Sequence, residues 1–244
     1  MTDPLFLAAL PAGVQVGDVV TVTGEEAFHA VTVKRIITGE SVLLADGEGA
    51  GVRAEVLETS KREFRVRVQE LLTEDAPPLS WGVVQALAKG DRSDIAVQMV
   101  TELGARGILA WQASRSIVRW QGDRAEKSLE KWRATAREAA KQSRRFVVPI
   151  VEAASTADVA AAIRGTDIAL VLHEDATQHI ADVELPAEGA GLVIVGPEGG
   201  ISSEELDTFL EAGAQAVSIS DGVLRTSTAA AVALGQLDVL ARRP

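Results

Sequence analysis

The last two thirds of the chain alternates between strand-like and helix-like patterns, and this alternation limits the possible folds more than any other feature. Apolar runs typical of buried strands occur at residues 81–88, 107–112, 168–172, 192–195 and 216–219. Helical patterns lie between or after them, at residues 91–104, 123–143, 156–164, 203–212 and 227–240. Such alternation predicts an α/β domain built on a mostly parallel sheet with helices on both faces.

The first part of the chain has a different pattern. Short strand-like runs alternate with turn signals at residues 5–7, 19–23, 42–45, 52–57 and 64–71, and a short helix is expected within residues 25–36. The last run, EFRVRVQEL, alternates apolar and charged residues as a half-exposed strand does. The acidic segment TEDAPPLS then carries two adjacent prolines. We therefore expect a small β-barrel at residues 1–72, a linker at residues 73–80 and the α/β domain at residues 81–244.

Composition narrows the classes of function. The chain of 244 residues has no cysteine, which excludes disulfides and thiolate metal sites and fits a cytoplasmic protein. Its three histidines have no metal-ligand spacing, and no apolar run reaches the length of a membrane span. The net charge is −11, but residues 115–145 hold ten Lys/Arg against four Asp/Glu. The basic segment can therefore form a local surface that binds anions such as RNA phosphates, although the whole protein is acidic. The alternative is that it is a solvated basic helix without a ligand.

Three loops follow predicted strands of the α/β domain: LHED at residues 172–175, GPEGG at 196–200 and SDGVLRTST at 220–228. Ligands of open α/β sheets bind beyond the carboxyl ends of the strands. GPEGG lacks the lysine of a P-loop and the glycine spacing of a dinucleotide fingerprint, and Glu198 would repel a phosphate. The turn suits a neutral or positively charged ligand, or is a tight turn without a ligand. Ser202 and Glu205 then form a predicted capping box that starts a helix.

These motifs also carry a family resemblance. VIVGPEGGIS, VSISDGVLRTSTAA and LVLHE resemble the three cofactor loops of the SPOUT class of RNA methyltransferases. With KGDRSDIAVQMVTELG at residues 89–104 and EAAKQSRR at 138–145, the chain resembles the bacterial RsmE family. That family methylates N3 of a uridine in small-subunit (16S) ribosomal RNA. The resemblance covers nearly the whole chain and implies that the N-terminal barrel is PUA-like.

The resemblance implies a trefoil knot in the C-terminal domain, a rare exception to the rule that chains do not thread loops. It also implies a homodimer and S-adenosylmethionine as the cofactor, with the small ribosomal subunit as the partner. The implied cofactor-binding residues are Leu172, His173, Gly196, Pro197, Glu198, Gly199, Gly200, Ile219, Ser220, Leu224, Thr226 and Thr228. The chain departs from the family pattern at Phe28, Gly222 and Ser227, to which no role is carried over.

Methylation of N3 requires alignment of the methyl carbon with the nitrogen and loss of the N3 proton. Arg225 stays charged, so it is expected to stabilise negative charge on the uracil carbonyls rather than to act as the base. A phosphate-binding role is the alternative for this arginine. Helical spacing places Arg133, Arg137, Lys141 and Arg144 on one face if the helix extends through residue 144. The expected RNA-binding residues are His29, Lys34, Arg35, Lys89, Arg92, Arg115, Arg119, Arg133, Arg137, Lys141 and Arg144.

Two alternative functions stay open at this stage. One is an RNA-binding or ribosome-assembly factor that keeps the fold without catalysis. The other is a SPOUT methyltransferase that acts on another RNA, such as tRNA. Binding of the cofactor separates the first from an enzyme, and the identity of the methylated RNA separates the second.

Overall fold

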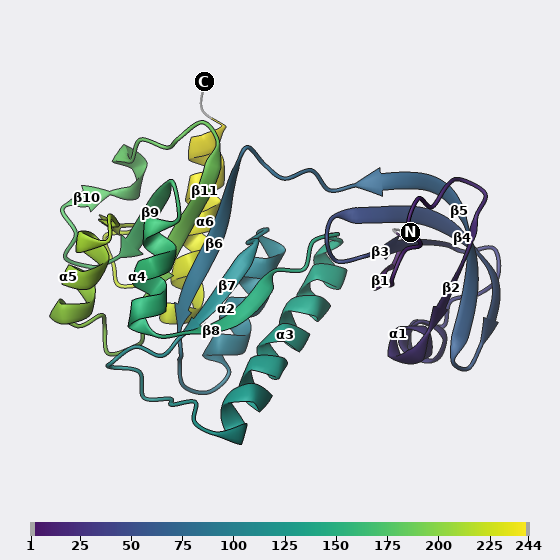
Figure 1. Ribbon diagram of the computed structural model, residues 1–244, viewed down its shortest axis with the longest axis horizontal. Helices are drawn as coiled ribbons and strands as arrows, with labels where there is room; N and C mark the ends of the chain where they lie inside the picture. The colour runs from purple at the N-terminus through teal and green to yellow at the C-terminus, as the bar shows by residue number, and fades with distance from the viewer. Residues whose placement is uncertain (1–2, 243–244) are drawn as a thin grey trace. The chain divides into compact units, whose positions relative to one another are not determined.

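The computed structural model of the protein describes residues 3–242 (Figure 1). Its contacts divide the chain into two compact units. The first consists of residues 1–75 and 140–148, and the second of residues 76–139 and 149–244. Each unit has its own sheet and its own buried core.

The first unit is a curled five-stranded sheet in the order β1-β3-β4-β5-β2. Its strands are β1 (Leu5–Leu7), β2 (Val19–Thr23), β3 (Ser41–Ala45), β4 (Ala50–Ser60) and β5 (Glu63–Thr73), and β1 pairs with β3 in parallel while the other pairs are antiparallel. Along β5 the side chains of Phe64, Val66 and Val68 are buried and the arginines between them are exposed. Phe64 meets Phe6 edge-on, with ring centroids 5.6 Å apart. The small N-terminal β-barrel expected from the sequence is confirmed as a curled five-stranded sheet.

The predicted helix at residues 25–36 is present as a short helix that widens. Helix α1 (Gly24–Phe28) continues directly into the π-helical turn η1 (His29–Lys34). The turn ends at Arg35, whose φ of 57° is in the left-handed region. Ala27 and Ala30 are buried in the core of the first unit. The basic pair Lys34-Arg35 at the end of the turn is exposed.

Residues 140–148 belong to the first unit although they come far later in the sequence. Phe146 packs in a cluster with Leu5, Leu43 and Ala45. A Cβ atom on Gly51 would lie 2.6 Å from the Phe146 ring, so glycine is required there. The Glu74 carboxylate accepts backbone N–H groups of Phe146 and Val147 and pairs with Arg145. These contacts fix the segment on the curled sheet.

The second unit is a seven-stranded parallel sheet in the order β10-β12-β9-β11-β6-β7-β8. Its strands are β6 (Leu79–Ala86), β7 (Gly107–Trp111), β8 (Ile150–Ala154), β9 (Ile168–Leu172), β10 (Gln178–His179), β11 (Gly189–Val195) and β12 (Gln215–Ser218). The mostly parallel sheet predicted from the alternating pattern is confirmed. Strands β8 and β10 and the short 3-10 helix η2 (Ile180–Asp182) were not expected.

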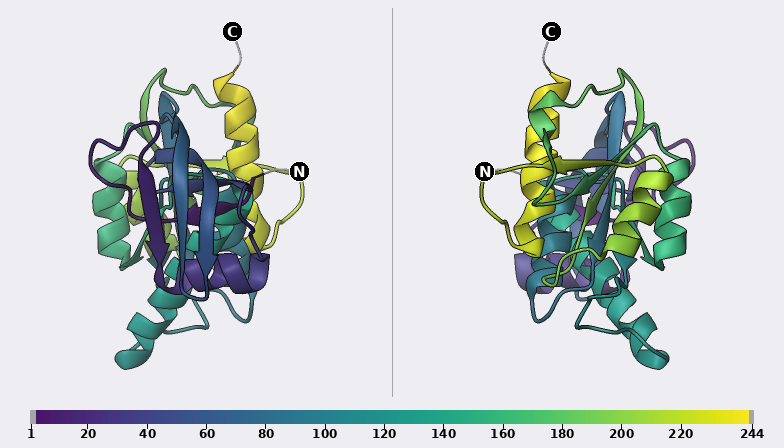
Figure 2. Two further views of the ribbon diagram at one scale, coloured as in Figure 1. Left: turned by 90° about the vertical axis from the view of Figure 1, so that its right-hand side faces the viewer. Right: turned by 90° about the vertical axis from the view of Figure 1, so that its left-hand side faces the viewer.

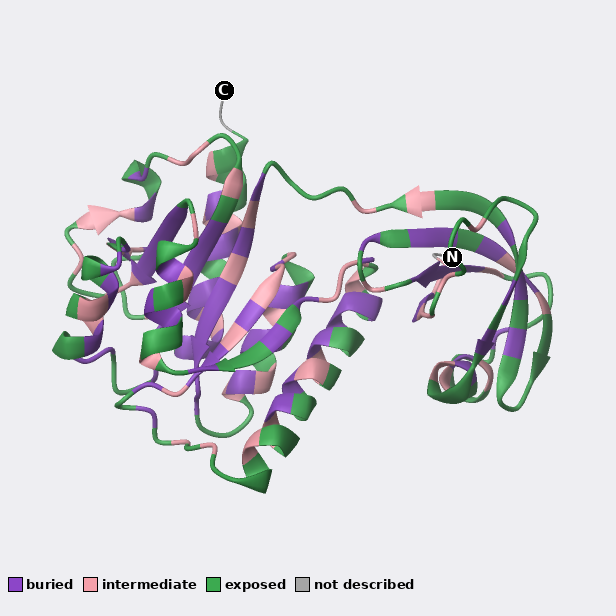
Figure 3. Cartoon of the chain, viewed as in Figure 1, coloured by how far each residue is buried: buried purple, intermediate pink, exposed green. Residues whose placement is uncertain are grey.

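Helices cover both faces of this sheet, as Figure 2 shows. They are α2 (Arg92–Glu102), α3 (Asp123–Ser143), α4 (Thr156–Arg164), α5 (Ser203–Glu211) and α6 (Thr226–Ala241). Helices α2 and α6 pack together, and α6 lies along β6 and β11, while α4 and α5 pack together on the opposite face. The central strands are therefore buried on both sides (Figure 3). This explains their continuous apolar runs.

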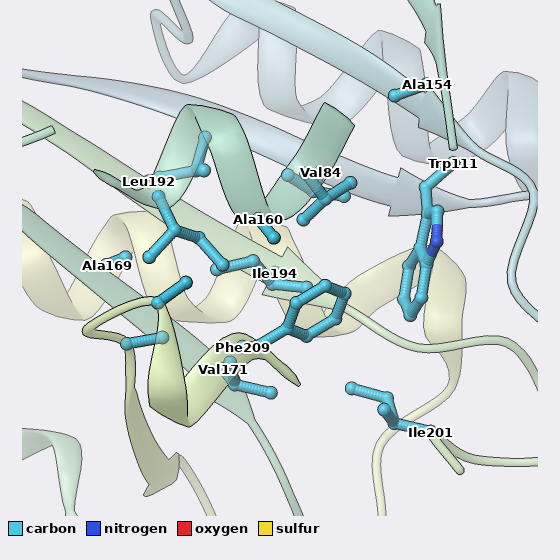
Figure 4. Close-up of a cluster of buried hydrophobic side chains, with 14 of the residues drawn as sticks. Val84, Trp111, Ala154, Ala160, Ala169, Val171, Leu192, Ile194, Ile201 and Phe209 are labelled. Carbon is cyan, nitrogen blue, oxygen red and sulfur yellow. The ribbon is translucent and has the colours of Figure 1, made fainter. Parts of the chain in front are cut away.

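The core on the face of α4 and α5 contains Trp111 and Phe209, the two largest side chains of the unit that are less than 2% exposed (Figure 4). Trp111 at the end of β7 meets Phe209 of α5 edge-on, with centroids 5.1 Å apart. Ile201, just before α5, and Ile194 of β11 complete this layer. The core thereby fixes the segment that leads from β11 into α5. Within residues 3–242, no helix combines the length and the apolar character needed to cross a membrane.

Candidate functional site

Three neighbouring strands end at the same edge of the parallel sheet. Strand β9 lies between β12 and β11, and Leu172 at its end is in register with Val217 of β12. The loops that begin at Leu172, Gly196 and Ile219 therefore leave from one edge, as expected for a ligand site in a sheet of this kind. The three predicted cofactor loops are brought together in this way.

Each of the three glycines of the GPEGG turn is subject to a different steric or backbone constraint. Gly200 has a φ of +73°, a conformation that other residues adopt at a cost, and its N–H bonds to the Pro197 carbonyl at 2.9 Å. A Cβ on Gly196 would lie 2.6 Å from Cγ1 of Ile201. A Cβ on Gly199 would lie 3.3 Å from both Cβ and the carbonyl oxygen of Arg115. Apart from any ligand, the turn thus disfavours a side chain at Gly196 and Gly200, while a Cβ at Gly199 would only make a tight contact with Arg115.

The Glu198 carboxylate is engaged within the protein. It accepts the Lys89 N–H at 3.1 Å and pairs with Arg92 at 3.0 Å. Burial raises the pKa of this carboxyl, but hydrogen bonds from its own N–H, from Lys89 N–H and from Arg92 outweigh burial, and the net pKa lies below its ordinary value. Arg92 therefore partly compensates the charge of Glu198, and the carboxylate by itself does not select a positively charged ligand.

The loop after β12 is anchored at both ends and exposed between them. The Ile219 carbonyl accepts Nε2 of Gln236 at 3.0 Å, and the buried Thr226 begins helix α6. Between them, Ser220 and Arg225 are exposed and Leu224 is half-buried. The Ser220 hydroxyl accepts the Gly222 N–H at 3.3 Å.

Arg225 is held by its backbone and has a free side chain. Its carbonyl accepts Thr228 N–H at 2.9 Å and the Thr228 hydroxyl at 3.1 Å. No hydrogen bond or ion pair of its guanidinium is formed with any residue between 3 and 242. The side chain is therefore available to a substrate.

His173, the remaining residue of the first loop, closes a local turn. Its N–H donates to the Val217 carbonyl at 3.0 Å, and its Nδ1 accepts the Asp175 N–H at 3.2 Å. Both contacts are internal to the edge of the sheet, and they set the path of the chain after Leu172.

Glu205 connects three loops at this edge and was recognised in the sequence only as half of a capping box. The box is confirmed, since Ser202 and Glu205 bond reciprocally. Glu205 also accepts the N–H of Ser114 at 2.7 Å, the Ser114 hydroxyl at 2.8 Å and the Thr156 hydroxyl at 3.2 Å. Burial raises its pKa, but these donors outweigh burial and hold the pKa below the ordinary value. A buried carboxylate thus ties α5 to α4 and to the loop after β7.

The basic residues expected to bind RNA divide into those with protein partners and those without. In the second unit Arg115 donates to the carbonyls of Gly199 and Ile201, both at 3.4 Å, and Arg119 donates to the Ser114 carbonyl. Arg133 pairs with two glutamates one turn or two turns earlier in α3. By contrast, Arg137 and the side chain of Lys89 are exposed, and neither is bonded to any described residue.

Helix α3 ends at Ser143, so the condition that it extends through residue 144 is not met. Arg144 follows the helix with a φ of 55° in the left-handed region. Lys141 is 7% exposed and its Nζ lies 2.7 Å from Glu26. These two residues belong to the first unit, whereas Arg133 and Arg137 belong to the second.

A pocket of about 180 Å³ lies in the first unit, beside the end of α3. Its lining combines the N-terminal strand with the basic residues that were expected to bind RNA: Asp3, Pro4, Leu5, His29, Lys34, Lys141, Gln142 and Arg144. Three cationic side chains, one histidine and the Asp3 carboxylate therefore surround a volume large enough for a small anionic group. Arg35, which follows Lys34, is exposed outside this lining.

The edge of the sheet in the second unit exposes apolar side chains and backbone groups. Leu172 and Leu224 are half-exposed where core leucines would be buried, and the backbone of the Gly199-Gly200 turn is exposed. Two buried side-chain oxygens near the loop, Oε1 of Gln85 and Oε1 of Gln236, have no partner among residues 3–242. Sequence reasoning missed both glutamines, because nothing in the local pattern marks them.

The features of both units match known families. The family described as RNA methyltransferase domain matches residues 75–238, and the family described as RNA methyltransferase PUA domain matches residues 22–69. The parallel sheet with its three converging loops and the curled sheet before it are those of an RNA methyltransferase with a PUA domain.

Individual relatives show which family of RNA methyltransferases the chain belongs to. Ribosomal RNA small subunit methyltransferase E of Mycobacterium bovis is 45% identical over 234 residues, which cover 93% of this chain and 88% of that protein. The protein of the same name from Bacillus subtilis is 30% identical over 226 residues, covering 89% of this chain and 88% of that protein. The chain belongs to the ribosomal RNA small subunit methyltransferase E family.

The same relationship is seen in three dimensions. The crystal structure of ribosomal RNA small subunit methyltransferase E from Neisseria gonorrhoeae, bound to S-adenosyl methionine, superposes with a TM-score of 0.86. The match covers 98% of each chain at 29% sequence identity.

Proposed function

We propose that this protein transfers a methyl group from S-adenosylmethionine to N3 of a uridine in the 16S RNA of the small ribosomal subunit. The observation that carries the proposal is the 45% identity to a ribosomal RNA small subunit methyltransferase E over 93% of the chain. The cofactor-bound relative of the same name supports the choice of cofactor. The converging loops supply a site at the edge of the sheet where such a cofactor fits.

The cofactor would be held by the three loops of the second unit. When bound, it supplies an electrophilic methyl group. Leu172 and Leu224 are partly exposed and offer apolar surface to the adenine, whereas Ile219 is buried, and exposed backbone groups of the Gly199-Gly200 turn offer hydrogen bonds. The residues proposed to contribute are those of the sequence prediction: Leu172, His173, Gly196–Gly200, Ile219, Ser220, Leu224, Thr226 and Thr228. Among them, Glu198 acts through the turn, because its carboxylate is paired with Arg92.

Arg225 is the proposed catalytic residue. Its guanidinium is exposed and free of partners among the described residues, and it stands directly before helix α6 in the third loop. As N3 of the uracil loses its proton, negative charge develops on the flanking carbonyls. A charged donor placed there stabilises the transition state more than the ground state.

The RNA would bind through phosphates and an unpaired base. N3 lies on the Watson–Crick edge, so the target uridine has to be unpaired or flipped. Among the expected RNA-binding residues, the side chains without a partner between residues 3 and 242 are Lys89 and Arg137 in the second unit and Lys34, Arg35 and Arg144 in the first. We assign the pocket beside the end of α3 to one phosphate of the RNA, since its volume suits that group and Lys34 and Arg144 can contact it, whereas Lys141 is already paired with Glu26.

We infer a homodimer through the second unit. The alanines of α6 that suggested close helix packing are buried within the protomer: Ala229, Ala230, Ala231 and Ala233. The exposed apolar residues are instead Val232 and Val239 of α6 and Ile95 of the neighbouring α2. Light scattering tests the dimer. We expect twice the chain mass for the wild type and the chain mass for Val239→Lys, and a monomeric wild type would contradict the dimer.

The trefoil knot and the cytoplasmic location also stay proposals. The knot is proposed from the family, and the start of α6 lies next to the GPEGG turn, where the Thr226 hydroxyl donates to the Gly196 carbonyl at 2.8 Å. The lack of cysteine supports a reducing compartment.

Two measurements test the proposed function. Calorimetry with S-adenosylhomocysteine is expected to show binding, and its failure would favour an RNA-binding factor without catalysis. Methyl transfer from labelled cofactor is expected to small subunits that lack the modification and not to tRNA. Labelling of tRNA instead would assign the enzyme to the other RNA.

A further inference from the structure

Two glutamine side chains contact the ends of the loop formed by residues 219–226. Gln236 of α6 donates from Nε2 to the Ile219 carbonyl at 3.0 Å. Gln85, near the end of β6, donates from Nε2 to the Thr226 hydroxyl at 2.9 Å. The first and the last residue of the loop are therefore each held by an amide, while most of the residues between them are exposed.

The contact at Thr226 is one step of a directed chain of hydrogen bonds. The Thr226 hydroxyl donates to the Gly196 carbonyl at 2.8 Å, so it must accept from Gln85. The second Nε2 proton of Gln85 goes to the Ala86 carbonyl at 3.2 Å. A flipped amide would place Oε1 against Ala86 O, so the two carbonyls fix the orientation of the amide. The chain joins the end of β6, the GPEGG turn and the start of α6.

Packing alone does not explain Gln85. Its side chain is 1% exposed on β6, and it lies in register with Val195 of β11 and Ala110 of β7. An apolar residue is the ordinary occupant of such a position, and a buried amide is tolerated only when its polar atoms are bonded. Here Oε1 has no partner among residues 3–242, so the amide is only partly satisfied. A costly residue that bonds one proposed cofactor loop directly, and a second one only through Thr226, indicates a functional requirement.

We propose that Gln85 and Gln236 are positioning residues of the methyl-transfer site. They hold the ends of the 219–226 loop, and Gln85 acts through Thr226 and Gly196 to set the spacing between that loop and the GPEGG turn. Leu224 and Arg225 directly precede Thr226, so the same contacts place the proposed adenine wall and the proposed catalytic guanidinium. This inference rests on the proposed function.

The test uses variants of the full-length protein that separate positioning from packing. Gln85→Leu keeps most of the volume and removes the donor, Thr226→Val is close to isosteric and breaks the chain, and Thr226→Ser restores the hydroxyl. Gln98→Leu, an exposed glutamine of α2, is the matched control. Calorimetry with S-adenosylhomocysteine, RNA affinity and thermal unfolding are measured for each. Gln236→Leu tests the other end of the loop in the same way.

We expect Gln85→Leu and Thr226→Val each to weaken S-adenosylhomocysteine binding about tenfold to a hundredfold, the scale of one buried hydrogen bond. RNA affinity should stay at the wild-type value, and Thr226→Ser should recover most of the cofactor affinity. The double variant Gln85→Leu/Thr226→Val should lose little more than either single variant, because both break one chain.

Three results would overturn the inference: wild-type cofactor affinity in Thr226→Val, equal losses in Thr226→Val and Thr226→Ser, or losses that add in the double variant. If Gln85→Leu does not fold, the two Thr226 variants decide by themselves. Failure of the wild type to bind S-adenosylhomocysteine would instead refute the proposed function, and the two failures are thereby distinguishable.

Discussion

At the scale of single residues, Arg225 carries the proposed chemistry. We expect Arg225→Ala to lower the single-turnover rate about tenfold to a thousandfold at saturating RNA and cofactor, the scale of losing one charge-stabilising donor. The unfolding temperature should not change, because the guanidinium bonds to no described residue. Arg164→Ala, at the exposed end of α4, is the control. A variant that loses only RNA affinity would make Arg225 a phosphate contact.

Glu205 is the residue on which the stability of the site edge depends. Glu205→Gln should lower the free energy of unfolding by about 1–3 kcal/mol at neutral pH, because a buried carboxylate with several donors is replaced by an amide. Glu211→Gln, exposed at the end of the same helix, is the control. Urea denaturation measures both, and equal stability of the two variants would contradict the assigned role.

The same residue gives a pH dependence with a definite sign. The folded pKa of Glu205 lies below its unfolded value of about 4.3. Its stabilisation is therefore complete above the unfolded pKa and is lost as pH falls through the folded pKa. The difference in unfolding free energy between wild type and Glu205→Gln should shrink below about pH 4. A difference that grows toward acid pH would show that the sign is wrong.

At the scale of elements, the GPEGG turn depends on one backbone conformation. Gly200→Ala should destabilise the protein by about 1–2 kcal/mol, since φ is +73° and alanine adopts the left-handed region at that cost. Gly222→Ala is the matched control, because open space surrounds a Cβ there and its φ is outside that region. Chemical denaturation compares the two, and equal stability would remove the need for glycine at position 200.

Helix α3 supplies the clearest test of RNA contact in the second unit. Arg137→Ala should weaken RNA binding and lower the salt slope by about one, because one fewer counterion is released. Arg133 is unsuited to this test, since two glutamates already pair with it. Arg164→Ala again serves as the control. An unchanged salt slope for Arg137→Ala would exclude Arg137 from the RNA interface.

The sequence predicted the elements with strong periodicity and missed those without it. Strand β9 is a run of buried apolar residues and was placed correctly. Strand β8 was missed because it is an edge strand with only two buried residues and begins at Ile150, which is exposed. Strand β10 has two polar residues and is defined by its pairing with β12 alone. Pairing partners of this kind are not visible in a local pattern.

Long-range contacts limited the prediction of the site in the same way. The three loops were found because strand ends in a parallel sheet share one edge. The bond of Glu205 to Ser114 spans 91 residues and that of Gln85 to Thr226 spans 141. Neither follows from spacing. The pairing of Glu198 with Arg92 also could not be seen in the sequence, and it weakens the charge argument made for the GPEGG turn.

At the scale of the whole molecule, chemistry and docking are assigned to different residues. The second unit holds the proposed cofactor loops and Arg225, and the first holds the pocket lined by Lys34, Lys141 and Arg144. The segment 140–148 belongs to the first unit through Phe146 and Glu74, although it follows helix α3 directly. The basic residues that were expected on one helical face are therefore divided between the two units, with Arg133 and Arg137 in the second and Lys141 and Arg144 in the first.

The most direct test of the proposed function is mass-spectrometric mapping of methylated nucleotides in 16S ribosomal RNA from cells with and without this protein. We predict one N3-methyluridine that is present with the wild type, absent without the protein, and not restored by Arg225→Ala at wild-type abundance. An identical set of methylated nucleotides in both strains, or a lost methyl group at an atom other than uridine N3, would contradict the proposed activity.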